Sequence, residues 1–62
     1  MPIVTVQWLE GRTKDQKTEM AKAITDAMVD IGKTKADGVH IVFHDMPKEN
    51  WSSGGVLLSD RP

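Results

Sequence analysis

The first segment of the chain carries β-branched and other apolar residues in the pattern of a strand. Residues 2–9, PIVTVQWL, therefore predict a strand. Alternate side chains point to opposite faces, and both rows contain apolar residues: Val4, Val6 and Trp8 in one, Ile3 and Leu9 in the other. Both faces of the strand are therefore expected to be at least partly covered.

The next segment changes to the period of a helix. Thr13 and Gln16 have the spacing of a capping box, and Asp15 suits the positive end of a helix dipole. Six apolar residues follow at helical spacing and predict the core-facing stripe: Met20, Ala21, Ile24, Ala27, Met28 and Ile31. Charged residues lie largely off this stripe: Lys14, Lys17, Lys22, Asp26 and Asp30. Gly32 is the expected stop.

A second strand is predicted at residues 39–45, VHIVFHD. Strand, helix and strand in this order make a β-α-β unit of the α/β class, and its strands are parallel if they are neighbours in one sheet. Gly54 and Gly55 predict a turn between short strands, which gives a C-terminal β-hairpin. Residues 1–62 are expected to form a single domain.

The length of the chain predicts self-association. A chain of 62 residues buries only about 60% of its unfolded surface, and one helix can cover one face of a two-stranded sheet. There is no cysteine, so neither a disulfide nor a thiolate metal site can stabilise the fold. Other copies of the chain are therefore expected to cover the second face and the strand edges.

The charge and hydropathy of the chain exclude several classes of partner. Eight basic and nine acidic residues give a net charge of −1, which argues against a nucleic-acid-binding surface. No apolar stretch approaches the roughly 20 residues of a transmembrane helix. The first residues lack the features of a signal peptide, so a soluble cytoplasmic protein is expected.

Few residues of the chain carry obvious chemistry. On a strand, His40 and His44 would lie roughly 13 Å apart, too far to share a metal ion, and no metal site is predicted. Arg12, in a glycine turn, is either an exposed loop charge or a bidentate ligand for a carboxylate. Pro2 is either an ordinary first residue of a strand or, once Met1 is removed, a free secondary amine.

Pro2, the LEGR run of residues 9–12, the capped helix and the Gly-Gly tail occur together in one family. In these features the sequence resembles the small 4-oxalocrotonate tautomerases of the tautomerase superfamily, over essentially its whole length. The resemblance implies that Met1 is cleaved and that Pro2 is the catalytic general base. It also implies that Arg12 binds a substrate carboxylate and that Trp51 is the aromatic wall of the site.

The resemblance further implies a homohexamer, described as a trimer of dimers, that uses no cofactor or metal. Many members carry a second arginine in the second strand, supplied to the substrate by a neighbouring subunit. This sequence has His40 there, and a histidine is charged only part of the time near neutral pH. Binding of a dicarboxylate is therefore expected to be weaker.

The implied activity is that of an isomerase of aromatic compound catabolism. It would interconvert the keto and enol forms of a small carboxylate substrate, a 2-hydroxydienoate or 2-oxo acid such as 2-hydroxymuconate. Two alternatives stay open: a proline-dependent dehalogenase or decarboxylase of the same superfamily, and a non-enzymatic oligomeric binding module.

Overall fold

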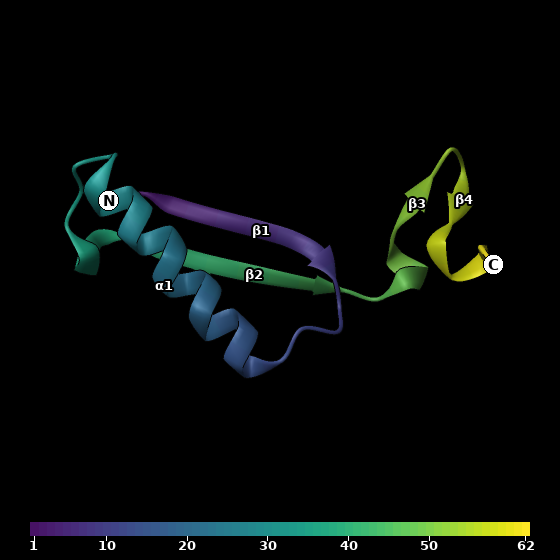
Figure 1. Ribbon diagram of the computed structural model, residues 1–62. Helices are drawn as coiled ribbons and strands as arrows, with labels where there is room; N and C mark the ends of the chain where they lie inside the picture. The colour runs from purple at the N-terminus through teal and green to yellow at the C-terminus, as the bar shows by residue number, and fades with distance from the viewer.

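The protein is described by a computed structural model of residues 1–62, which forms a β-α-β unit followed by a hairpin (Figure 1). β1 (Ile3–Leu9) pairs in parallel with β2 (His40–Met46), and α1 (Lys14–Asp30) lies along one side of this sheet. β3 (Ser52–Ser53) and β4 (Val56–Leu57) form an antiparallel hairpin that projects beyond the C-terminal ends of β1 and β2. The predicted fold class is therefore confirmed. Three short 3₁₀ turns complete the chain: η1 (Ala36–Gly38), η2 (Lys48–Asn50) and η3 (Leu58–Asp60).

The predicted capping box begins α1. The Thr13 hydroxyl accepts a hydrogen bond from the Gln16 backbone N–H at 3.1 Å, and the Gln16 side-chain oxygen accepts one from the Thr13 N–H at 2.9 Å. The helix ends just before Gly32, as predicted, but the left-handed residue is Lys33, with a φ of 58°. Gly32 is required for a different reason, because a Cβ there would lie 2.7 Å from the Met28 carbonyl oxygen.

The helix is rotated from the predicted stripe. The residues that face the sheet and are partly buried are Lys17, Ala21, Ile24, Thr25 and Met28. The prediction is therefore confirmed for Ala21, Ile24 and Met28 and wrong for Met20, Ala27 and Ile31, which are exposed in the single chain. Lys17 was expected off the stripe; it faces the sheet because its ammonium group pairs with Asp45 of β2.

One face of the sheet has no cover in the single chain. Ile3 pairs with His40 and Thr5 with Val42, so these four side chains share the face away from α1. Ile3 is 68% exposed there and Val42 is 42% exposed. The helix-facing side carries Val4, Val6, Trp8, Ile41 and Phe43, which are half-buried.

The chain is more extended than a compact monomer of its length. No residue is buried, and the radius of gyration is 14.8 Å, against about 11 Å for a compact chain of this length. The accessible surface is 4818 Å², against about 4,000 Å² for a compact monomer of this mass. The excess, about 800 Å², matches what one partner buries in a standard protein interface.

The C-terminal hairpin closes through two glycines. Gly54 and Gly55 have positive φ values of 62° and 82°. The predicted tight turn requires such values at its two central residues. Arg61 donates a hydrogen bond to the Ser53 carbonyl at 2.5 Å and ties the end of the chain to the hairpin. No helix in the chain has both the length and the apolar character needed to cross a membrane.

Candidate active site

Pro2 and His40 lie at one end of the sheet. Pro2 directly precedes β1, and its carbonyl accepts a hydrogen bond from the His40 backbone N–H at 3.0 Å. The His40 side chain, however, shares the exposed face with Ile3, away from α1. The structure therefore brings the two backbones together, while the imidazole points away from the helix-covered side.

Arg12 and Trp51 lie at the opposite end of the β1–β2 sheet. Arg12 follows the last residue of β1, and Trp51 follows β2 after η2. The seven residues of β1 span about 20 Å, so Pro2 before the strand and Arg12 after it are separated by about that length in one chain. This distance is too great for one small acid to contact both residues in a single chain.

Arg12 is held by two contacts in the turn that Gly11 makes possible with its φ of 132°. Its Nη1 donates a hydrogen bond to the Leu9 carbonyl at 2.8 Å. The central carbon of the guanidinium lies 4.7 Å from the centre of the Trp8 ring, which is cation–π distance. Arg12 is thus an ordered arginine with further N–H groups left to donate.

A cluster around Trp8 escaped the sequence-based predictions. The indole N–H donates a hydrogen bond to Asp45 Oδ1 at 2.6 Å, and the ring stacks on Phe43 with 5.2 Å between centroids. Asp45 Oδ2 accepts a hydrogen bond from the Lys17 ammonium. Bonds from Lys17 and then Trp8, with the charges of Lys17 and Arg12, hold the pKa of Asp45 below its usual value. The sequence did show that Trp8 lies in one row with Val4 and Val6. It could not show that Asp45 and Phe43 are the partners of Trp8, because these partners depend on the register between β1 and β2.

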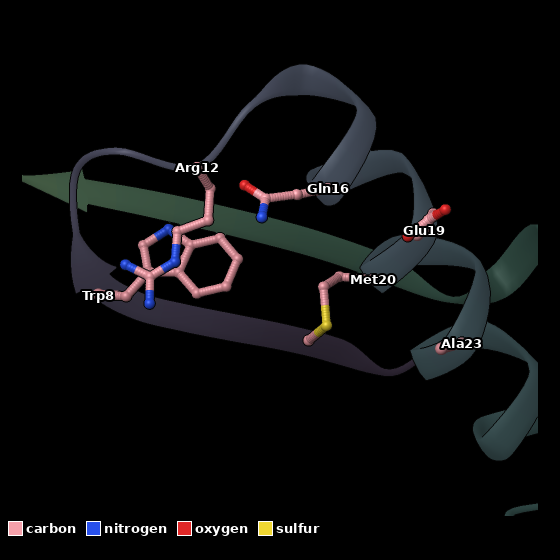
Figure 2. A pocket seen from close by; sticks show the side chains of 6 residues that line it. All are labelled: Trp8, Arg12, Gln16, Glu19, Met20 and Ala23. Atoms are coloured by element: carbon pink, nitrogen blue, oxygen red, sulfur yellow. The ribbon is translucent and has the colours of Figure 1, made fainter.

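Arg12 and Trp8 open onto a cavity of about 390 Å³ between β1 and the start of α1 (Figure 2). Its lining residues are Trp8, Arg12, Gln16, Glu19, Met20 and Ala23. The guanidinium and the Gln16 amide make one part polar, while Trp8, Met20 and Ala23 make another part apolar. A cavity of this size and lining suits a small carboxylic acid.

Trp51 lines a separate cavity of about 350 Å³. The other residues around it are Gln7, His44, Met46, Asn50 and Ser52. Gln7 pairs with His44 on the sheet face away from α1, so this cavity and that of Arg12 lie on different faces. The four predicted site residues therefore do not form one site within a single chain. No group of three metal-binding side chains occurs.

Comparison with known proteins gives matches over nearly the whole chain. The model of the tautomerase enzyme family matches residues 2–61. The 2-hydroxymuconate tautomerase of Comamonas testosteroni is 38% identical over 60 residues, which cover 97% of this chain and 95% of that protein. The crystal structure of YwhB, a homologue of 4-oxalocrotonate tautomerase, aligns with a TM-score of 0.93 at 31% identity, over 98% of this chain and 100% of that chain.

A heterohexameric 4-oxalocrotonate tautomerase from Chloroflexus aurantiacus J-10-fl is also similar. It aligns with a TM-score of 0.86 at 27% identity, over 97% of each chain. The match to the family model extends from Pro2, directly before β1, to Arg61, beyond the hairpin. On this evidence the chain belongs to the tautomerase family.

Proposed function

We propose that the protein is a cofactor-independent keto–enol tautomerase acting on a small 2-hydroxydienoate or 2-oxo acid such as 2-hydroxymuconate. The observation that carries the proposal is Pro2, which directly precedes β1 and is the residue at which the family match begins. The relative from Comamonas testosteroni, named a 2-hydroxymuconate tautomerase, supports this substrate class.

The proposed general base is the nitrogen of Pro2 after Met1 has been removed. While Met1 is attached, this nitrogen is an amide without basicity. Met1 is 84% exposed and belongs to no strand or helix, so a peptidase has access to it. The freed amine must be neutral to accept a proton, and both a desolvating aromatic wall and a nearby arginine favour the neutral form.

In the proposed reaction the 2-hydroxyl group of the dienol gives its proton to the Pro2 nitrogen. The electron pair of the broken O–H bond forms the carbonyl, the double bonds shift along the chain, and the far carbon takes the proton back from Pro2. The proton and electron count is unchanged, as an isomerisation requires. Arg12 binds the substrate carboxylate and Trp51 supplies the aromatic wall.

The assembly we propose is a homohexamer, a trimer of dimers, of one tautomerase-like domain per chain, residues 1–62. Three observations support it: the absence of any buried residue, the excess surface of about 800 Å², and the distance from Pro2 to Arg12 within one chain. The relative from Chloroflexus aurantiacus is a heterohexamer, which supports the number of six chains. In such an assembly Pro2 of one chain can meet Arg12 of another.

The test combines mass spectrometry with kinetics. Intact mass should show a chain without Met1, and this protein should ketonise 2-hydroxymuconate or phenylenolpyruvate faster than buffer does. Pro2→Ala should lower kcat/KM by about 100-fold or more, the contribution of a positioned general base. Pro62→Ala, at the exposed chain end, is the matched control and should keep full activity. Equal rates for Pro2→Ala and the unchanged protein would refute the mechanism.

A further inference from the structure

Trp8 is tied to all three elements of the β-α-β unit. It lies on β1, its indole N–H donates to Asp45 of β2 at 2.6 Å, and its ring stacks on Phe43 of β2 at an interplanar angle of 11°. Asp45 in turn accepts a hydrogen bond from Lys17 of α1. These contacts restrain both the plane and the edge of the indole ring.

This fixed ring is the surface on which Arg12 lies. Figure 2 shows the guanidinium in front of the indole, and its central carbon is 4.7 Å from the ring centre. The bond from Nη1 to the Leu9 carbonyl restrains the guanidinium further. An arginine restrained in this way loses little side-chain freedom when it binds a carboxylate, so its affinity depends on the surface beneath it.

The remaining lining of the cavity indicates which carboxylates fit. Met20 and Ala23 extend the apolar surface next to Trp8, which suits a planar conjugated chain attached to the carboxylate. Glu19, which bears a carboxylate, also lines this cavity. A second carboxylate on the ligand would be repelled there, whereas a neutral tail would not.

We propose that Trp8 is a positioning residue for Arg12, and that the two make this cavity a site for planar conjugated monocarboxylates in preference to dicarboxylates. The inference rests on the proposed function, in which Arg12 binds the substrate carboxylate, and it narrows the substrate class.

The first experiment measures binding without catalysis. In a Trp51→Phe protein, Trp8 is the only tryptophan and its fluorescence reports on the cavity. The probes are sorbate and trans,trans-muconate, which share a six-carbon conjugated chain and differ by one carboxylate. Sorbate should bind about fivefold more tightly than muconate, the order of magnitude of one like-charge repulsion in water. Arg12→Gln should abolish the signal, and Lys22→Gln, which removes an exposed cation from α1, should keep it.

The second experiment separates positioning from a general loss of structure. Trp8→Ala should raise KM for phenylenolpyruvate by roughly 2- to 30-fold with little change in kcat, because the carboxylate contact is the same in ground and transition states. Trp8→Phe keeps an aromatic ring and should raise KM less. In the Arg12→Gln protein, adding Trp8→Ala should raise KM by less than it does in the unchanged protein, since Trp8 acts mainly through Arg12.

The outcomes divide cleanly between the inference and the proposed function. Tighter binding of muconate, sorbate binding that does not depend on Arg12, or additive effects of the two substitutions would overturn the inference and leave the tautomerase proposal standing. Conversely, an inactive protein that binds sorbate through Arg12 would refute the proposed function and retain the ligand class. Circular dichroism and sedimentation of every variant verify that it folds and assembles as the parent does.

Discussion

The exposed sheet face offers the most direct test of assembly, through the substitution Ile3→Thr. Threonine keeps the β-branched shape that suits a strand but lacks much of the apolar surface. Ile3 is 68% exposed in the single chain, so about two-thirds of the roughly 1.5–3 kcal/mol for burying an isoleucine is gained only on assembly. The substitution should therefore cost about 1–2 kcal/mol per chain.

In a hexamer the cost arises in all six chains, and the assembly equilibrium depends on the fifth power of the protein concentration at half-assembly. That concentration should therefore rise roughly 8- to 60-fold, measured by sedimentation equilibrium over a dilution series. Val42→Thr, on the same face but only 42% exposed, should act in the same direction with a smaller shift. Val29→Thr is the control, because Val29 follows Lys22 and Asp26 on the polar row of α1. An unchanged midpoint for Ile3→Thr, or a folded monomer of the unchanged protein, would refute the reasoning.

Three further substitutions test other parts of the molecule. His40→Arg should raise kcat/KM for 2-hydroxymuconate relative to phenylenolpyruvate by roughly 10- to 100-fold, the value of a charge-assisted contact, and an unchanged ratio would make His40 a bystander. The pKa of Asp45 is lowered in the folded chain, so its ionised form stabilises the fold above about pH 4. The difference in Tm between the unchanged protein and Asp45→Asn should therefore be full at neutral pH and vanish as the pH falls through the lowered pKa; a constant difference would contradict this. Gly32→Ala should lower stability by about 1–3 kcal/mol in chemical unfolding, because the new Cβ would be 2.7 Å from the Met28 carbonyl oxygen, and a neutral result would mean that the helix end shifts freely.

The sequence by itself determined the features that depend on residues close together along the chain. The capping box needs only Thr13 and Gln16, and the hairpin turn needs only Gly54 and Gly55. The strands of residues 2–9 and 39–45 were predicted to within one residue of β1 and β2, because their β-branched pattern reports directly on extended backbone. Pro2 and Arg12 were identified as candidate site residues from a motif whose residues are also close together in the sequence.

The tertiary structure alone decided how these elements meet. The rotation of α1 turned Lys17 toward Asp45 and left Ile31 79% exposed, which no helical period could reveal because the stripe has apolar residues on both of its borders. The parallel register put Trp8 opposite Asp45 and beside Phe43, two partners from β2 that the sequence of β1 does not specify. Register and rotation are set by contacts between residues 28 to 37 positions apart, and a local pattern carries no information about such contacts.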